Sequence, residues 1–230
     1  MSSQKPLAYF ITGTDTGVGK TLISSALIHG FVQRGYSTVG MKPVADGCEL
    51  QGGELVSEDV AQLVSVSNVA APLRQVNPYA FLPPIAPHIA AEQAGVTISL
   101  DVIVGAYRQL SAQAEAVIVE GVGGFCVPLG AGIDMADLAQ QLALPVIMVV
   151  GMRLGCLNHA LLTAEAIKAR GLKLAGWVAN QVDPQMSVFD ENMQSLKKRL
   201  DASCLGVLPW LDNVNYLTAS NNLNVINLIA

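Results

Sequence analysis

Short, nearly continuous apolar runs alternate with longer amphipathic runs along the chain. The short runs are rich in Val, Ile and Leu and predict β-strands that are buried on both faces, at 7–12, 38–42, 116–120, 145–150, 174–179 and 204–209. Between them, apolar positions with helical spacing predict helices at roughly 20–34, 57–67, 99–114, 135–143, 155–170 and 187–201. This alternation predicts an α/β fold, a doubly wound and mostly parallel sheet with helices on both faces.

Three segments depart from this alternation. Residues 43–56 show little periodicity and are predicted to form a loop. Residues 72–88 are rich in proline and predict an irregular insertion followed by a short helix. The asparagine-rich end, 213–230, predicts a surface loop and a last apolar segment that returns to the body. Because no linker of domain scale is evident, we expect residues 1–230 to form a single domain.

A glycine-rich stretch, "GTDTGVGKT", joins the first predicted strand to the first predicted helix. Its end matches a phosphate-binding loop, but Gly13 lies one residue earlier than the usual spacing requires. A helix N-terminus offers free N–H groups and a positive dipole end to an anion. We therefore expect Lys20 to reach the β and γ phosphates, Thr21 to bind magnesium, and Gly17 and Gly19 to let phosphate approach the backbone. A plain strand-to-helix turn is the weaker alternative.

Two more predicted strands end in charged residues. Glu120 follows four apolar residues and precedes the glycine-rich segment 121–124, which favours a second magnesium ligand over a simple strand end. Lys42 ends its strand at the edge where parallel sheets bind ligands, in the same crevice as Lys20. Two converging lysines indicate a second anionic group near the γ phosphate. Asp59, taken alone, is typical of an ordinary acid in a first helical turn.

Composition narrows the class of protein further. Hydrophobic residues make up 51 % and charged residues 13 %, as a buried parallel sheet requires. The net charge of −5, with one basic cluster at 197–199, argues against a nucleic-acid partner. No apolar run reaches the ~18 residues of a membrane span and the N-terminus shows no signal core, so we expect a cytoplasmic location without a membrane partner. The cysteines and histidines are scattered without metal-ligand spacing, which favours reduced cysteines.

Several segments together closely resemble the dethiobiotin synthetase family, ATP-dependent enzymes of biotin biosynthesis with a P-loop NTPase-like fold. They are "GTDTGVGKT", "KPVADG", "VEGVGGFCVPL", "PVIMVVGMRLGCLNHALLT" and "LAGWVANQV". The resemblance runs from the first strand to "LGVLPWL", and five residues between the loop glycines are typical of that family. It implies a cyclo-ligase that uses ATP and Mg²⁺. Its substrates would be 7,8-diaminononanoate and CO₂, and its intermediates a carbamate and a carbamic-phosphoric anhydride.

The resemblance also implies roles for individual residues. Lys20, Lys42 and Thr16 would be catalytic, with the lysines beside the carbamate and the transferring phosphoryl group. Thr21, Asp59 and Glu120 would bind magnesium. Asn180 would bind adenine. The residues expected to bind the nucleotide and its metal are Gly17, Val18, Gly19, Lys20, Thr21, Leu22, Asp59, Glu120, Gly121, Val122, Gly123, Asn180, Gln181, Pro209, Trp210 and Leu211.

The resemblance implies a homodimer with its substrate site at the interface. The segment that would reach the substrate carboxylate from the neighbouring subunit consists of Gly155, Cys156, Leu157 and Asn158. One substrate position departs from the family, because Asp46 stands where a serine or threonine is usual. A carboxylate repels a carbamate and a triphosphate. Asp46 therefore points away, binds a cation or the free ammonium of the diamine, or marks a different handling of substrate.

Three other functions stay open at this stage. The first is a related ligase that forms an amide or closes a ring on another substrate. The second is a partitioning-type ATPase switch, which would carry an extra lysine early in the phosphate loop, where this chain has Thr14 and Asp15, and a terminal amphipathic helix that is not evident. The third is a small-molecule kinase, which often uses an arginine-bearing lid, whereas the arginines of this chain do not cluster.

Overall fold

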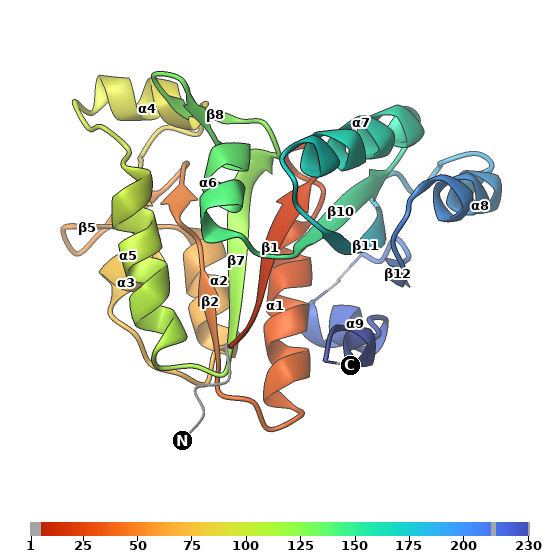
Figure 1. The fold of residues 1–230 in the computed structure, drawn as a ribbon, viewed down its shortest axis with the longest axis horizontal. Helices are drawn as coiled ribbons and strands as arrows, with labels where there is room; N and C mark the ends of the chain where they lie inside the picture. The colour runs from red at the N-terminus through yellow and green to blue at the C-terminus, as the bar shows by residue number, and fades with distance from the viewer. Residues whose placement is uncertain (1–5, 213–214, 230) are drawn as a thin grey trace.

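The centre of the molecule is a six-stranded parallel sheet in the order β12-β11-β10-β1-β7-β2 (Figure 1). The structure is a computed structural model that describes residues 6–212 and 215–229. The strands are β1 (Leu7–Gly13), β2 (Thr38–Met41), β7 (Ala116–Gly124), β10 (Val146–Met152), β11 (Leu174–Gln181) and β12 (Cys204–Leu208). The predicted doubly wound, parallel α/β fold is confirmed, and each predicted strand is present with its carboxyl end shifted by one to four residues.

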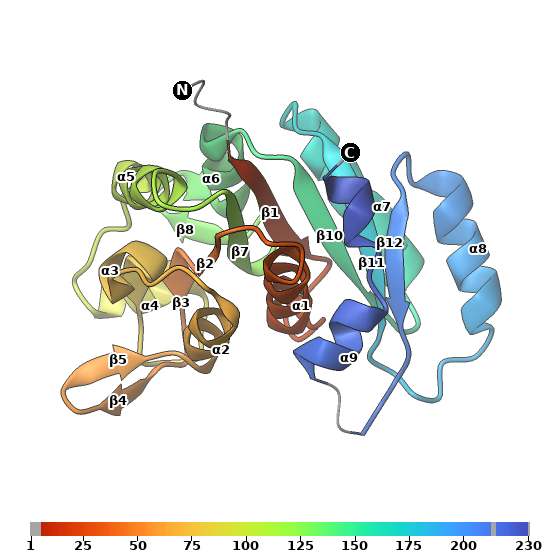
Figure 2. The same ribbon diagram turned by 90° about the horizontal axis from the view of Figure 1, so that it is seen from below.

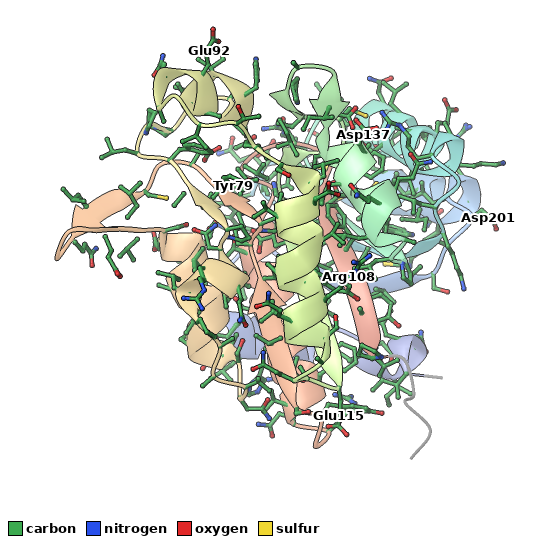
Figure 3. The ribbon with its side chains drawn as sticks, turned by 60° about the vertical axis from the view of Figure 1, so that its left-hand side comes forward. Tyr79, Glu92, Arg108, Glu115, Asp137 and Asp201 are labelled. Atoms are coloured by element: carbon green, nitrogen blue, oxygen red, sulfur yellow. The ribbon has the colours of Figure 1, made fainter. Side chains whose placement is uncertain are left out.

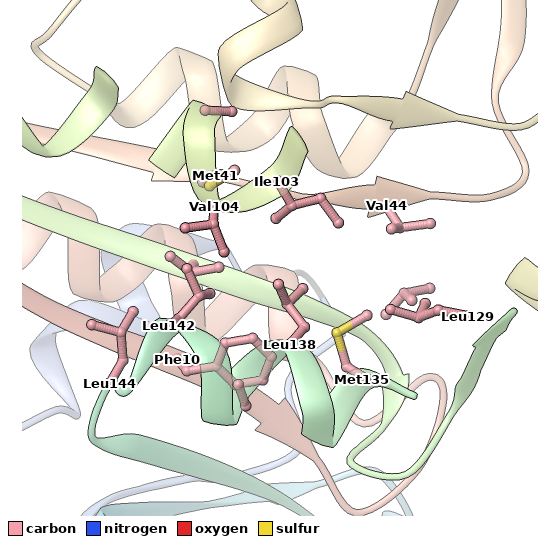
Figure 4. Packing of buried hydrophobic residues seen from close by; sticks show 14 of the residues in the cluster. Phe10, Met41, Val44, Ile103, Val104, Leu129, Met135, Leu138, Leu142 and Leu144 are labelled. Atoms are coloured by element: carbon pink, nitrogen blue, oxygen red, sulfur yellow. The ribbon is translucent and has the colours of Figure 1, made fainter. Parts of the chain in front are cut away.

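Helices cover both faces of this sheet (Figure 2). One face carries α1 (Lys20–Val32), α2 (Glu58–Val66) and α9 (Tyr216–Asn221). The other carries α5 (Leu100–Ser111), α6 (Met135–Leu142), α7 (Cys156–Ala169) and α8 (Phe189–Arg199). The apolar runs are nearly continuous because successive strand residues face opposite helix layers. In β1, Phe10 packs with Leu138 of α6 (Figure 4), whereas Tyr9 and Ile11 belong to the cluster under α1.

The prediction of a loop at residues 43–56 was wrong. This segment contains β3 (Val44–Ala45), β4 (Glu49–Gln51) and β5 (Glu54–Val56). β4 and β5 form an antiparallel hairpin, whereas β3 pairs in parallel with β6 (Tyr79–Ala80). Strands of two or three residues are too short to produce an alternating pattern, so only their pairing partners reveal them.

The proline-rich insertion agrees in part with its prediction. A short helix, α4 (Pro87–Gln93), follows the irregular segment as expected, but α3 (Leu73–Val76) and β6 lie inside that segment. A second small hairpin, β8 (Pro128–Gly130) with β9 (Ile133–Asp134), lies between β7 and α6. Among the described residues, none of the helices is both long and apolar enough to span a bilayer.

The C-terminal segment is more ordered than a surface loop. Asn215 caps α9 by accepting the backbone N–H groups of Leu217 and Thr218, each at 3.0 Å. A 3₁₀ helix, Val225–Leu228, follows and packs on α1, where a Cβ on Gly30 would lie 2.8 Å from Val225 Cγ2. The predicted return of an apolar segment to the body is therefore confirmed, and positions 213, 214 and 230 of that prediction lie outside the described residues.

The amino ends and the carboxyl ends of the parallel strands form opposite edges of the sheet, and these edges differ in their polar contacts. At the amino edge, Glu115 accepts the backbone N–H and the hydroxyl of Ser37, both at 2.9 Å. These bonds, the backbone one first, lower the pKa of this exposed carboxyl. Figure 3 shows Glu115 at the opposite end of the molecule from Glu92 of α4. At the carboxyl edge, by contrast, Lys20, Lys42 and Glu120 are buried, and buried charges of this kind indicate a functional site.

Candidate active site

The phosphate loop lies between the end of β1 and the start of α1. Gly17 and Gly19 have φ angles of 73° and 90°, in the left-handed region that favours glycine. Gly13 is required for a different reason, because a Cβ there would lie 2.7 Å from Val18 Cγ2. Lys20, the first residue of α1, is buried, and its Nζ donates to the backbone oxygen of Asp15 at 3.1 Å. The loop thus wraps around the lysine at the helix N-terminus.

The phosphate loop has one residue more between Gly13 and Gly19 than the usual spacing, and the structure explains it. Thr14 donates its backbone N–H to the Val149 oxygen at 3.0 Å, and its hydroxyl oxygen accepts the Gly151 N–H at 3.3 Å. Thr14 therefore continues the pairing of β1 with β10 before the loop turns away. The nonstandard spacing adds an anchor on the neighbouring strand and leaves the arrangement of Lys20 and Thr21 at the helix start intact.

Four polar side chains converge at the carboxyl edge of the sheet. Lys42 Nζ lies 2.6 Å from Glu120 Oε1 and 2.8 Å from Asp59 Oδ2. Thr21 Oγ1 lies 2.7 Å from Asp59 Oδ1 and 2.8 Å from Glu120 Oε1, so its one proton serves two acceptors. Glu120 is fully buried, and its Oε2 has no hydrogen-bond partner in the described part of the chain. The cluster joins four elements that are far apart in sequence: the starts of α1 and α2, the end of β2 and the middle of β7.

The charges of this cluster shift one another. Burial, followed by repulsion from Lys42, lowers the pKa of Lys20 to about 8. Burial alone would lower the pKa of Lys42, but the carboxylates of Glu120 and Asp59 outweigh burial and raise it. Burial alone would raise the pKa of Asp59, but Lys42 outweighs burial and lowers it. Lys42 therefore stays protonated and positively charged. The protonated form of Lys20, by contrast, is stabilised when an anion binds beside it.

A cavity of about 380 Å³ opens onto this cluster. Its lining residues come from the phosphate loop, the ends of β2 and β3, the start of α2 and the end of β7: Thr16, Gly17, Gly19, Lys20, Thr21, Lys42, Asp46, Asp59, Glu120, Val122 and Gly123. Asp46 lines this cavity. The other candidate residues do not line it: Val18, Leu22, Gly121, Gly155, Cys156, Leu157, Asn158, Asn180, Gln181, Pro209, Trp210 and Leu211.

The donor set fits a magnesium ion held together with phosphates. Mg²⁺ prefers oxygen ligands and is usually bound through one or two carboxylates plus substrate phosphates. Asp59, Glu120 and the Thr21 hydroxyl supply such oxygens within one hydrogen-bonded group, and the unpartnered Glu120 Oε2 adds a buried acceptor. The described residues contain no group of three or more His, Cys, Asp or Glu that could hold a metal by itself. Phosphate oxygens would therefore complete the coordination.

Asn180 lies at the end of β11 against the phosphate loop. Its Nδ2 donates to the Val18 oxygen at 2.8 Å, and a Cβ on Gly19 would lie only 2.3 Å from the same nitrogen. The side chain of the neighbouring Gln181 accepts the backbone N–H of Trp210 at 3.2 Å, and Trp210 is 47 % exposed. The residues expected around adenine thus form a connected group beside the loop. The contact of Asn180 with the loop was not predicted from sequence.

The segment expected to reach substrate from a second subunit lies at the start of α7. Gly155 has a φ of 96° and begins the helix, while the preceding Leu154 is 96 % exposed. Arg153, next to it, forms an ion pair with Asp15 of the phosphate loop. Sequence reasoning missed this ion pair because its members are 138 residues apart, and no local pattern connects them.

The fold and this site define a P-loop nucleotide-binding protein. A similar fold occurs in the MinC:MinD cell division protein complex of Aquifex aeolicus, with a TM-score of 0.57 over 96 % of this chain and 93 % of that chain. At 14 % sequence identity, this likeness shows the fold alone. A family model described as an AAA domain matches residues 8–217.

Sequence comparison identifies the family. The ATP-dependent dethiobiotin synthetase of Aromatoleum aromaticum is 56 % identical over 205 residues, which is 89 % of this chain and 91 % of that protein. The synthetase of Nitrosospira multiformis is 51 % identical over 220 residues, 96 % of each chain. The chain belongs to the family of ATP-dependent dethiobiotin synthetases, which are ligases of biotin biosynthesis. The family resemblance inferred from the motifs is confirmed.

Proposed function

We propose that this protein converts 7,8-diaminononanoate, CO₂ and ATP to dethiobiotin, ADP and phosphate. One amine takes up CO₂ to form a carbamate and releases a proton. A carbamate oxygen attacks the γ phosphorus of ATP, ADP leaves, and a carbamic-phosphoric anhydride results. The second amine attacks the carbamate carbon, closes the ureido ring and expels phosphate. The observation that carries this proposal is the pair of buried lysines, Lys20 and Lys42, in one cavity with paired carboxylates.

The lysines would act through charge and position. Phosphoryl transfer needs little covalent help from the protein, and donors aimed at the developing charge supply most of the rate enhancement. Lys20 would hold the β and γ phosphates, and Lys42 would face the carbamate and the transferring group. The backbone of Thr16 to Gly19 would wrap the phosphates. Thr21, Asp59 and Glu120 would hold Mg²⁺, which when bound neutralises phosphate charge.

The ends of β11 and β12 would hold the adenine. The amide of Asn180 can both donate to and accept from a purine edge. The loop 209–211, fixed to Gln181 through the Trp210 N–H, would flank the base. Positions Gly155 to Asn158 would bind the substrate carboxylate of a neighbouring copy in a homodimer, and the exposed Leu154 supports an interface there. A cytoplasmic location, a single domain and the absence of nucleic-acid and membrane partners stay predictions.

The alternatives are less well supported. No comparison favours a partitioning-type switch: the MinC:MinD cell division protein complex shares the fold at 14 % sequence identity, against 56 % for the Aromatoleum synthetase. A related ligase with another substrate would keep the lysines and the metal ligands. The substrate therefore has to be tested directly.

Mass spectrometry of the products tests the proposal. The enzyme is incubated with ATP, magnesium, bicarbonate and diaminononanoate, and we expect dethiobiotin and ADP in equal amounts. Substituting ¹³C-bicarbonate should add one mass unit to the product, since the ureido carbon comes from CO₂. Equal turnover in buffer freed of CO₂ would rule out the carbamate route. ATP hydrolysis without dethiobiotin would instead favour one of the alternative functions.

A further inference from the structure

Asp46 lines the cavity on a backbone segment that is held by hydrogen bonds. It follows β3, where the Phe81 N–H donates to the Ala45 oxygen at 2.8 Å and the Cys48 N–H donates to the Phe81 oxygen at 3.0 Å. These bonds fix the backbone on both sides of Asp46. Its side chain is half-buried and lines the same cavity as Lys20 and Lys42. Asp46 therefore lines the cavity that holds both lysines, on a backbone segment fixed by hydrogen bonds.

The Asp46 carboxylate differs from the other carboxylates of the cavity in its ion pairs. The other two carboxylates of the cavity, Asp59 and Glu120, both pair with Lys42. Among the residues that the structure describes, none forms an ion pair with Asp46. Burial raises the pKa of the Asp46 carboxyl more than the attraction of Lys42 lowers it. A bound cation would offset that cost of burial.

The chemistry of the substrate supplies a cation of suitable size at this place. The two amines of 7,8-diaminononanoate are on neighbouring carbon atoms, so the second amine stays within a few bonds of the carbamate. If the carbamate lies beside Lys20 and Lys42, the second amine must lie in the same cavity. An aliphatic amine is protonated near neutral pH. A single carboxylate suits an ammonium group, whereas Mg²⁺ demands near-octahedral coordination by several oxygens.

We propose that Asp46 binds the ammonium group of the substrate amine that does not carry the carbamate, and so makes the site selective for diamines. This inference rests on the proposed function. It makes Asp46 a residue that determines specificity through its charge. A serine or threonine at this position could offer the ammonium group only a neutral hydrogen bond. Charge-assisted hydrogen bonds contribute about twice as much as neutral ones.

The experiment compares the parent enzyme with Asp46→Asn, which removes the charge and keeps the shape. Calorimetry with magnesium, a non-hydrolysable ATP analogue and bicarbonate measures the affinity for diaminononanoate and for 7-aminononanoate and 8-aminononanoate. The parent should prefer the diamine over either monoamine by ~10–100-fold, the range of one charge-assisted hydrogen bond. In Asp46→Asn this preference should fall to ~2–10-fold, the range of one neutral hydrogen bond, with the affinity for the ATP analogue unchanged. Glu49→Gln, an equal change of charge on the adjacent exposed strand β4, should retain the parent preference.

Two outcomes would overturn the inference. One is a preference for the diamine that persists undiminished in Asp46→Asn. The other is an equal loss of affinity for the diamine and the monoamines, which would indicate a structural role. Asp46→Ser serves as a second variant if Asp46→Asn does not fold, and the same loss of preference is expected. Absence of dethiobiotin from the parent enzyme would count against the proposed function itself, so the two failures are distinguishable.

Discussion

Replacing Lys42 by methionine should destabilise the protein as well as slow its reaction. Lys42→Met keeps much of the apolar stem and removes the only charge that contacts the fully buried Glu120 in the described structure. Removing one member of a buried pair typically costs about 3–5 kcal/mol, because the other charge stays buried without compensation. The Asp59 partner adds less, since its side chain is 43 % exposed and solvent screens it.

That loss of free energy corresponds to a large shift in melting temperature. For a chain of this length, 1 kcal/mol shifts Tm by roughly 2–4 °C, so Lys42→Met should lower Tm by about 6–20 °C. Urea unfolding followed by circular dichroism, in buffer with EDTA and without nucleotide, measures the free energy of unfolding. Lys168→Met, on the exposed face of α7, is the matched control and should stay within about 0.5 kcal/mol of the parent.

A double-mutant cycle isolates the interaction between Lys42 and Glu120. Glu120→Gln in the Lys42→Met background removes the uncompensated charge, so the double variant should be more stable than Lys42→Met alone. Turnover of Lys42→Met should fall by ~10²–10³, whereas ATP affinity should change little because Lys20 and the loop backbone remain. A loss of stability below about 1 kcal/mol, or a double variant as unstable as the sum of the single changes, would refute the reasoning.

Three further predictions follow from the site. Glu120→Gln should keep the fold and lose turnover most strongly at low magnesium, and full activity at low magnesium would exclude Glu120 as a metal ligand. Because the pKa of Lys20 is about 8, Lys20 is charged below that pH, and nucleotide affinity should fall as the pH rises through it. Calorimetry in two buffers of different ionisation enthalpy at about pH 8.5 should therefore detect proton uptake on binding, and no uptake would contradict the shift. Gly19→Ala should lower the free energy of unfolding by roughly 2–3 kcal/mol, from left-handed backbone strain and displacement of Asn180. Gly53→Ala is the control, because its φ is 91° and no atom lies within 4 Å of the added Cβ, so it should show the backbone strain alone. An equal loss of unfolding free energy in both variants would show that Asn180 does not restrain the loop.

Local sequence determined the framework of this protein. Apolar runs such as 7–12 and 145–150 become buried central strands because only a residue pattern without alternation suits a sheet that is covered on both faces. The position of Lys20 and Thr21 at a helix start also follows from local features, since a glycine turn between strand and helix leaves few other conformations. The same reasoning predicted Lys42 and Glu120 at strand ends. Lys42 directly follows β2, whereas Glu120 lies inside the longer β7, next to the Met41–Val119 pair and so level with the end of β2.

Tertiary structure decided which of these residues touch. Lys42 and Glu120 are 78 residues apart, and their contact exists because β2 and β7 are neighbours in the sheet, a strand order that periodicity does not encode. The sequence did not reveal β3 or the hairpin of β4 and β5 for the same reason. Strands this short are stabilised by pairing with a partner strand, and local sequence does not identify that partner. The anchoring of Thr14 on β10 likewise depends on a strand more than 130 residues away. Local interactions specify elements, whereas contacts between distant residues depend on the topology that brings those elements together.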